Sequence, residues 1–472
     1  MNGKPPRLRC WSSQFLLRLG IMLAMAVAFS AAARPGHSDA VIPADPPLNW
    51  WKGNLHTHSF WSDGSDFPEM IAEWYRTHGY NFLALSDHNI LSEASRWKPF
   101  HEIDAAYRTE VLQKYVDRFG MDWVETRGTR ETDSFEIRLK PLTEFRSLVE
   151  ERGRFLMIPS EEISAMAPEG PVHVNATNIK EVIFPLEGET AHAVLEANLR
   201  AVHEQAKRTG REILPHLNHP NFKYTFTAEI LAAVTADKFF EVYNGHMSVN
   251  HLGDADHPSM ERMWDIANTI RVADLHAPPL YGIATDDSHN YHGNPRAAPG
   301  RGWVMVRCRH LTPEKLIAGL RSGDFYASAG VVLSEVRFDE QAQSLEIRIQ
   351  PEDGVAYTTE FIGTLVDYDA SSEPRTDAEG NPIHSTRKYS ADVGQVFSRQ
   401  TGTSPAYQLT GGELYVRAVV TSDHAHPVPS FEGHMEQAWT QPVGWRKRLE
   451  EMVSNAPSDV SEEPATEPSS EE

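Results

Sequence analysis

The sequence predicts an α/β barrel followed by a small antiparallel β domain. Two patterns support this prediction. Short apolar runs that end in His, Asp or Glu alternate with longer amphipathic stretches, which is typical of parallel β/α units. After about residue 328 the chain changes to short alternating segments separated by polar, turn-rich stretches, which is typical of a β-sandwich-like domain.

The first part of the chain contains seven apolar runs that we predict to be strands. They lie at 51–55, 82–85, 155–159, 172–177, 213–217, 239–243 and 281–285. Amphipathic stretches at 68–78 and 191–209 are predicted helices. Seven or eight β/α units suggest a barrel, and polar residues stand at the C-terminal end of nearly every run. In β/α barrels that rim carries the chemistry.

The N-terminal residues 1–33 have the pattern of a bacterial-type signal peptide. A basic start precedes an apolar run at 19–33, which ends in three alanines that fit a cleavage site. An uncleaved membrane anchor is the alternative, but a span needs about 20 apolar residues and this run is shorter. We therefore expect a secreted or periplasmic protein with no stable membrane span after cleavage.

Composition changes divide the remainder of the chain. Pro-rich residues 34–49 are a predicted linker, 50–327 a hydrolase domain, and 328–445 a C-terminal β domain with strands near 332–338, 345–349, 359–362 and 414–420. Residues 453–472 are rich in Ser, Pro and Glu without aromatics, and we expect them to form a disordered acidic tail.

Residues 90–150 interrupt the β/α rhythm with many aromatic and charged residues. They are predicted to be a helical insertion after a strand that carries site residues. The insertion could form a lid or a substrate-selecting wall, or it could be a peripheral helical pair.

The composition limits the possible functions. The formal net charge of −22 argues against nucleic-acid binding, which needs a basic face. An anionic substrate would therefore need strong local positive charge, which bound divalent metals supply. The 22 histidines gather mostly between residues 56 and 292, which points to metal chemistry.

Two motifs carry this chemistry. His56 and His58 end a strand, and a side-chain period of two points both imidazoles to one side, where they can share a divalent ion. Asp63 follows after a turn and can reach an adjacent ion. The run at 82–85 ends in Asp87 and His88, and burying such a pair is costly unless the two residues are paired or bound to metal.

Together these motifs resemble the opening signature of the PHP (polymerase and histidinol phosphatase) family. Later segments match in order over residues 50–330. They are 158–163 for the family's Gly-x-Glu-Ile strand, 171–174 for a histidine within a strand, 217–220 for Ala-His-Pro, and 282–289 for Ser-Asp-Ser-His. Segments 319–330 and 438–442 resemble those that link secreted PHP proteins to a C-terminal sandwich. That domain could shape the active-site entrance or bind a surface.

The resemblance implies a distorted (β/α)7-type barrel with up to three divalent metals, Zn, Mn or Fe, at its rim. It assigns nine ligands: His56, His58, Asp63, His88, Glu162, His173, His219, Asp287 and His289. One ion would lie with His56, His58, Glu162 and Asp287, a second with Glu162, His173 and His219, and a third with Asp63, His88 and His289. Glu161 competes with Glu162 for the bridging position.

Neighbouring polar residues are candidates for catalysis or for orienting ligands. His246, Glu241 and His216 are the candidate catalytic residues, and either a metal-bound water or His246 would donate a proton to the leaving group. Glu241 and His246 could instead orient ligands or bind substrate, and His216 could be a buried structural histidine. Asp87 and Asp286 are predicted to orient ligand imidazoles.

Arg296 and Arg301 could grip a phosphate or be ordinary solvated arginines. His251, His257, His276 and His292 are read as surface or packing residues.

The resemblance implies hydrolysis of a small phosphomonoester or phosphodiester by a hydroxide that bridges two metals. Two alternatives stay open. The same site could cleave amides or esters, or the metals could stabilise a non-catalytic binding protein.

Overall fold

The computed structural model describes residues 47–455, and each of the seven predicted strands has a counterpart among them. These are β1 (Asn49–Asn54), β2 (Phe82–Leu85), β6 (Leu156–Ala167), β7 (Gly170–Thr177), β8 (Leu214–Leu217), β9 (Phe239–Asn244) and β10 (Tyr281–Thr285). The predicted signal peptide, most of the linker and the tail from residue 456 lie outside the described residues. Within 47–455, no helix has both the length and the apolar character needed to cross a bilayer.

The strands join one mixed sheet of 13 strands, ordered β10-β9-β8-β7-β6-β2-β1-β11-β12-β21-β20-β15-β18. The pairs β10–β9, β9–β8, β6–β2 and β2–β1 are parallel, whereas β7 is antiparallel to both of its neighbours. The prediction of parallel units throughout is therefore wrong at β7. Only Pro168 and Glu169 separate β6 from β7, and a parallel crossover needs a dozen or more residues.

Among the described strands, no continuous ladder closes the sheet into a barrel, because β10 and β18 are its two edges. The segments that follow β10 and β1 meet at the isolated bridge Thr57–Ser288, where the His58 N–H donates to the Ser288 carbonyl over 2.9 Å. Further along β10, the side-chain amide of Gln441 pairs with both backbone groups of Gly282, at 2.8 and 2.9 Å.

One apolar cluster is nevertheless shared by the strands around this space. It includes Leu55, Phe82, Ile158, Leu214, Phe239, Ile283, Val304 and Phe325. The last two come from β11 (Trp303–Cys308) and β12 (Phe325–Ala329), which pair antiparallel after β1. The strands therefore enclose a common core although their ladder is open.

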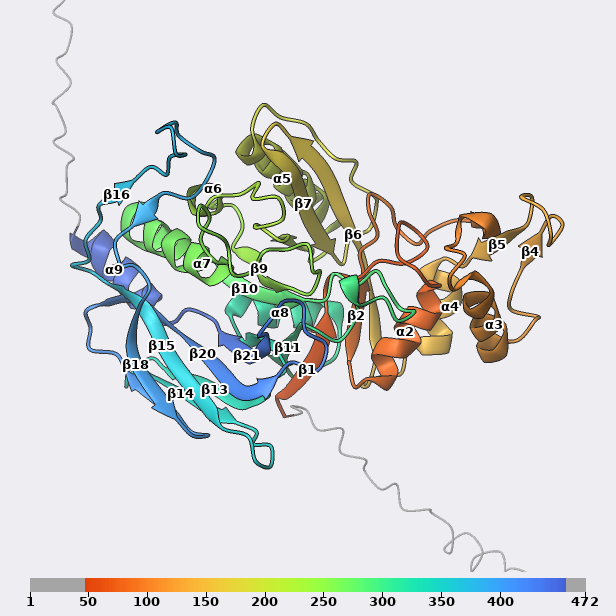
Figure 1. The fold of residues 1–472 in the computed structure, drawn as a ribbon. Coiled ribbons are helices and arrows are strands. Elements are labelled where there is room, and N and C mark those ends of the chain that lie inside the picture. The colour runs from red at the N-terminus through yellow and green to blue at the C-terminus, as the bar shows by residue number, and fades with distance from the viewer. Residues whose placement is uncertain (1–46, 456–472) are drawn as a thin grey trace, which may run out of the picture. The chain divides into compact units, whose positions relative to one another are not determined.

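Helices cover the outside of these strands (Figure 1). α2 (Pro68–Thr77) starts on Pro68 and buries Ile71, Ala72 and Tyr75 on one face. α5 (Ala191–Thr209) is capped by the Thr190 hydroxyl, ends at Gly210 with φ 64°, and packs on β6 and β7. The helices α6 (Ala228–Ala233), α7 (Met260–Thr269) and α8 (Pro313–Ser322) lie in the same part of the chain.

Residues 90–150 are not purely helical, contrary to the prediction. They contain α3 (Arg108–Phe119) and α4 (Leu142–Val149), and also a three-stranded antiparallel sheet, ordered β3-β5-β4. Its strands are β3 (Arg96–Pro99), β4 (Thr126–Arg127) and β5 (Glu136–Leu139). The strands are two to four residues long, which leaves little periodicity for sequence to reveal.

The C-terminal strands extend the large sheet rather than starting a separate one. β15 (Tyr357–Leu365), β18 (Gln395–Thr401), β20 (Glu413–Ala425) and β21 (Met435–Thr440) continue it beyond β12. A second sheet of β13 (Leu333–Asp339), β14 (Ser344–Ile349) and β19 (Ala406–Gln408) packs on them through Leu345, Ile347, Phe361 and Val420. Short strands β16 (Ser372–Glu373) and β17 (Lys388–Tyr389) pair separately, and α9 (Trp445–Asn455) includes the first residues of the predicted tail.

Candidate metal centre

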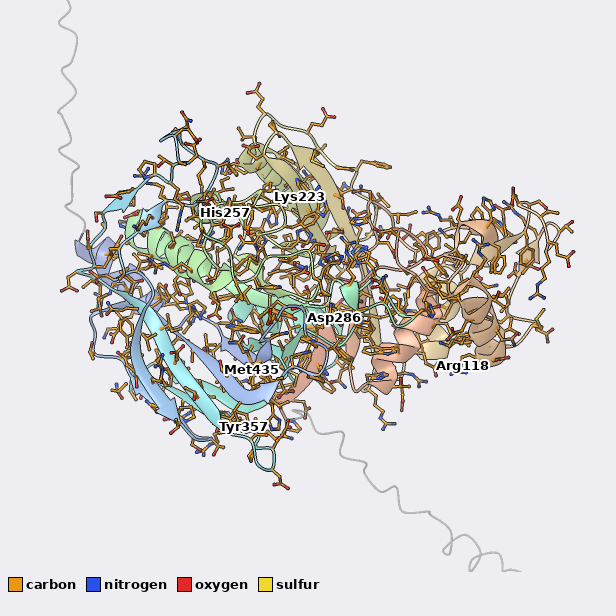
Figure 2. The ribbon with its side chains drawn as sticks, viewed as in Figure 1. Arg118, Lys223, His257, Asp286, Tyr357 and Met435 are labelled. Carbon is orange, nitrogen blue, oxygen red and sulfur yellow. The ribbon has the colours of Figure 1, made fainter. Side chains whose placement is uncertain are left out.

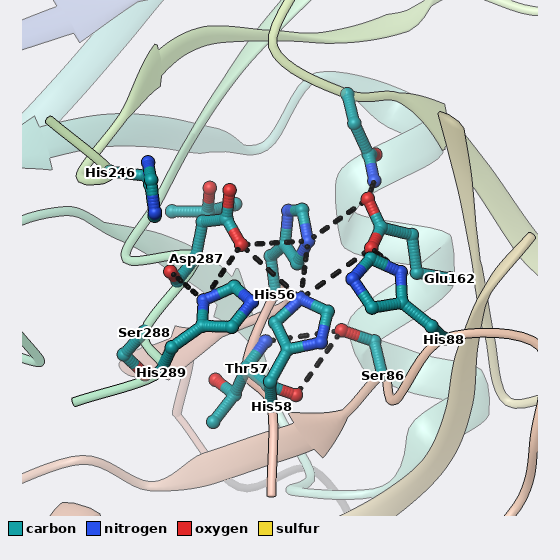
Figure 3. Close-up of polar contacts among 12 residues, drawn as sticks. His56, Thr57, His58, Ser86, His88, Glu162, His246, Asp287, Ser288 and His289 are labelled. Atoms are coloured by element: carbon teal, nitrogen blue, oxygen red, sulfur yellow. Dashed lines mark hydrogen bonds and ion pairs between the residues drawn. The ribbon is translucent and has the colours of Figure 1, made fainter. Parts of the chain in front are cut away.

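The nine predicted metal ligands lie together in one cluster. Figure 3 shows six of them, His56, His58, His88, Glu162, Asp287 and His289, with their side chains converging. They come from β6 and the segments just after β1, β2 and β10, while His173 lies in β7 and His219 follows β8. Burial inside the rim brings together residues that are up to 233 positions apart, 289 minus 56.

The first group lies deepest. Nε2 of His56 and Nε2 of His58 are 3.1 Å apart, and each is 3.2 Å from Asp287 Oδ1. Glu162 approaches the same two nitrogens to 3.3 and 3.5 Å. Four ligands placed about 2.1 Å from one ion at tetrahedral angles would be about 3.4 Å apart. The spacing of this group therefore suits a single divalent ion.

Glu162 also faces a second group of ligands. Its Oε1 is 2.9 Å from His173 Nδ1 and 3.4 Å from His219 Nε2. The carboxylate is 1% exposed, so it lies between two sets of imidazoles out of contact with bulk water. Glu162 is therefore in the position that a bridging ligand would take.

A third group gathers around Asp63. Its Oδ1 is 3.4 Å from His289 Nε2 and 3.6 Å from both His88 Nε2 and His58 Nδ1. The Asp63 side chain is 58% exposed, unlike those of the other groups. This part of the cluster opens to solvent.

The electrostatics of the cluster follow from packing acids and imidazoles together. Burial raises the pKa of Glu162, but His88, His173 and His56 outweigh that effect and hold it well below its ordinary value. Burial lowers the pKa of His88, yet Glu162 and Asp63 raise it to about 9. His56 responds in the same direction through Asp287, Glu241 and Glu162. The buried carboxylates are thus stabilised by nearby positive charge, which protons on the imidazoles or metal ions can supply.

Two of the ligand positions have left-handed backbone geometry. His219 has φ 28° and Asp287 has φ 47°, although neither is glycine. Such conformations cost about 1–3 kcal/mol and persist where the surroundings impose them. The cluster therefore contains two strained ligand positions.

Glu241 in β9 orients His56. The carboxylate is fully buried, and its Oε1 lies 2.7 Å from His56 Nδ1. Its oxygens also accept hydrogen bonds from the Thr285 hydroxyl, the Asn244 amide and the His219 backbone N–H. This arrangement fixes the tautomer of His56 with the proton on Nδ1 and leaves Nε2 free as a ligand.

Three polar residues that the sequence did not single out hold the other ligands. The Ser164 hydroxyl is 2.6 Å from His88 Nδ1, and the Asn218 amide donates to Glu162 Oε1 over 2.7 Å. The Asn244 amide donates to both Glu241 and Asp287. Asn218 precedes a predicted ligand directly, which is the only local signal that could have identified it.

Asp87 and Asp286 do not contact imidazoles, contrary to the prediction. Asp87 accepts hydrogen bonds from the backbone and hydroxyl groups of Ser59 and Ser62, and so fixes the loop after β1. Asp286, labelled in Figure 2, accepts from the Tyr75 hydroxyl and from the backbone N–H groups of residues 300–302. Both carboxylates stabilise loops that carry ligands.

A cavity of about 170 Å³ opens over the cluster. Besides seven of the predicted ligands, it is lined by His246, Phe222 and Val249. No lysine or arginine is among these described lining residues. Positive charge for an anionic ligand would thus have to come from protonated histidines or bound ions.

Of the three candidate catalytic residues, only His246 lines this cavity. Its Nδ1 accepts from the Ser248 backbone N–H over 3.1 Å, so the neutral ring carries its proton on Nε2. Burial lowers the pKa of His246 to about 4. Glu241 and His216 are fully buried beneath the cluster, and His216 lies 3.6 Å from Glu241. Neither of these two residues lines the cavity, and their action on substrate stays a prediction.

Arg301 does not grip a ligand either. Its guanidinium is fully buried and donates to five carbonyls, those of Gly245, Pro295, Arg296, Val428 and Pro429. All five N–H donors of the group are therefore used. The neighbouring Arg296 is exposed.

Of the two residues that could take the bridging position, Glu161 and Glu162, the geometry of the strand favours Glu162. Successive strand residues face opposite sides, and Glu162 faces the cluster. Glu161 faces away, where it accepts a hydrogen bond from the Ile183 backbone N–H over 2.7 Å. Burial raises the pKa of Glu161 to about 8.

Comparisons with known proteins gave only structural likenesses. No family profile and no curated protein matches the chain. One similar solved structure is a two-domain protein of Bacteroides vulgatus that contains a predicted PHP-like metal-dependent phosphoesterase, with 15% identity, TM-score 0.35, 79% of this chain covered and 90% of that one. Another is a candidate metal-dependent phosphoesterase of Bifidobacterium adolescentis, with 14% identity, TM-score 0.27, and coverages of 59% and 96%.

Proposed function

We propose that this protein is a metal-dependent hydrolase that cleaves small phosphoesters at the cluster of His56, His58, Glu162 and Asp287. The observation that carries the proposal is the convergence of nine imidazole and carboxylate side chains below one solvent-open cavity. Three groups of side chains, two sharing Glu162 and one around Asp63, are the basis for proposing up to three ions. A purely structural site rarely needs an open face above its ligands.

The donor set fits divalent metals. It consists of nitrogen and oxygen ligands without thiolate, which suits Zn, Mn or Fe. The Nε2 atoms of His56 and His58 face each other at 3.1 Å. A metal ion bound by both nitrogens would remove the repulsion between their lone pairs. When bound, divalent ions polarise phosphoryl oxygens, lower the pKa of water and offset developing negative charge.

The chain's own residues would bind and orient the substrate. With its pKa near 4, His246 is neutral at pH 7 and presents Nε2–H to the cavity. Its role is therefore a hydrogen-bond donor to the phosphoryl or leaving-group oxygen rather than the proton donor expected from sequence. Phe222 and Val249 form an apolar wall beside the cluster, where a leaving group can pack.

A metal analysis combined with a substrate panel tests this proposal. Wild type, His58→Ala and the control His276→Asn are compared, because His276 is an exposed histidine outside the cluster. We expect His58→Ala to lose bound metal and to slow hydrolysis of phosphomonoesters or phosphodiesters by at least about 100-fold. The control should match wild type.

The panel also includes peptide, amide and lactone substrates. Metal-dependent cleavage of these, without cleavage of phosphoesters, would replace our proposal by the amide or ester hydrolase. If every substrate that metal-loaded wild type cleaves is cleaved equally by His58→Ala, or if wild type cleaves none, the site is not catalytic. Secretion or export to the periplasm, absence of nucleic-acid binding, and a small-molecule substrate form part of the same proposal, on the sequence features described above.

A further inference from the structure

A second cavity lies between the insertion and the wall of strands. We call it the insertion pocket. It has a volume of about 290 Å³ and is lined by residues from α4, the loop after His88, β6 and the segments that flank α5. The Leu142 N–H donates to the Ser92 carbonyl over 2.8 Å, which ties α4 to the loop. No residue of the metal cluster lines this pocket.

Part of the lining of the insertion pocket is apolar. Leu85, Leu91, Met157, Ile158 and Ile179 are buried residues that contribute to it. Sites for small molecules are mostly apolar cavities of about 300–1,000 Å³ with a few polar groups that orient the ligand. The insertion pocket has this character and the size for a small ligand.

The charged residues around the pocket are mostly cationic. Arg146, Lys180 and Arg211 line it, against a single acidic residue, Glu93. Three cationic groups at one pocket stand out in a chain whose net charge is −22. This local excess of positive charge favours an anionic ligand.

The cations have hydrogen-bonding capacity left for a ligand. In the described part of the chain, the Arg211 guanidinium donates one hydrogen bond, to the Ile179 carbonyl over 3.2 Å. Arg146 is partly used, by Glu150 at 3.1 Å and the Met157 carbonyl at 2.8 Å. A guanidinium has five N–H donors in a planar fork that matches a carboxylate. Arg211 is thus the best placed to bind one.

We propose that the insertion pocket binds a small amphipathic carboxylate, with its apolar chain against Leu91, Met157 and Ile179 and its carboxylate on Arg211 and Lys180. The site is a binding site separate from the metal cluster. Leu91 lies three residues after His88, and Ser160 lies two residues before Glu162, and both line the pocket. An occupant therefore contacts the two segments that hold these members of the metal cluster.

Calorimetric titration of the metal-loaded full chain with decanoate tests the proposal. Acetate, which lacks the chain, and decanol, which lacks the charge, are the ligand controls. We expect decanoate to bind at least tenfold more tightly than either. Arg211→Gln should weaken decanoate at least tenfold, whereas Arg399→Gln, an exposed arginine of the C-terminal strands paired with Glu360, should leave it unchanged.

Two further variants separate the pocket from the metal cluster, since a carboxylate also binds metals. Thr143→Trp places a large ring at the exposed mouth of the pocket and should abolish binding, while His58→Ala should leave the affinity unchanged. The proposal is overturned if decanoate binds no better than acetate or decanol. It is equally overturned if its affinity falls in His58→Ala but survives in Arg211→Gln and Thr143→Trp.

Discussion

Arg301 provides a sharp test of the site's architecture, since sequence alone assigned it the same role as Arg296. Arg301→Lys keeps the charge but offers at most three N–H donors in place of five. At least two of the five carbonyls bound by Arg301 then lose their partner. A buried unsatisfied group costs about 1–3 kcal/mol, so we expect a loss of about 2–6 kcal/mol in the free energy of unfolding.

Urea denaturation of the metal-loaded protein, followed by tryptophan fluorescence, measures this loss. The matched control is Arg296→Lys, five residues earlier and exposed, where surface substitutions change stability by less than about 0.5 kcal/mol. If Arg301 gripped substrate instead, Arg301→Lys would raise KM for a phosphoester and leave unfolding unchanged. That result would refute the reasoning.

Three other outcomes follow from contacts described here or from a shifted pKa. Burial raises the pKa of Glu69, fully buried beneath the insertion, from 4.5 to about 7. Between these two pH values the folded state holds a proton that the unfolded state has lost, so the free energy of unfolding falls as pH rises through this window. In urea unfolding, Glu69→Gln should therefore remove about 2–3 kcal/mol of the stability loss between pH 5 and pH 8. Equal pH dependence in wild type and Glu69→Gln would contradict this prediction. Glu241→Gln should weaken metal binding about 10–100-fold in chelator competition, because His56 loses the carboxylate that orients it, and unchanged affinity would show that Glu241 does not act through His56. Chelation should lower the unfolding free energy by about 4 kcal/mol when free metal had stood 1,000-fold above Kd, whereas a melting curve insensitive to chelator would argue against bound ions.

The positions of the strands could be predicted from local apolar patterns, and the nine clustered residues from the resemblance of their motifs to a family signature. Apolar runs that end in His, Asp or Glu identify strands, and the strand period of two separates Glu162 from Glu161 once the strand is placed. Motif spacing then orders the ligands along the chain. The role of each ligand remains a prediction that metal analysis has to test.

Features that depend on distant partners could not be predicted. Arg301 and Arg296 lie in the same stretch of sequence, but the buried one is fixed by Val428 and Pro429, more than 120 positions away. Ser164, which contacts His88, belongs to a common residue type with no motif of its own. The small sheet at 90–150 and the continuation of the large sheet into the C-terminal strands likewise arise from pairings that no local pattern encodes.

The amide of Gln441 has a consequence for the fate of shortened chains. An edge strand with free N–H and carbonyl groups is a template for pairing with another molecule, and it promotes aggregation. In β10 the Gln441 side chain occupies both groups of Gly282 and is itself 4% exposed. A chain that stops before residue 441, through proteolysis or premature termination, would leave both backbone groups of Gly282 without this partner. Because β10 is buried, the two unsatisfied groups would lower the stability of the shortened chain.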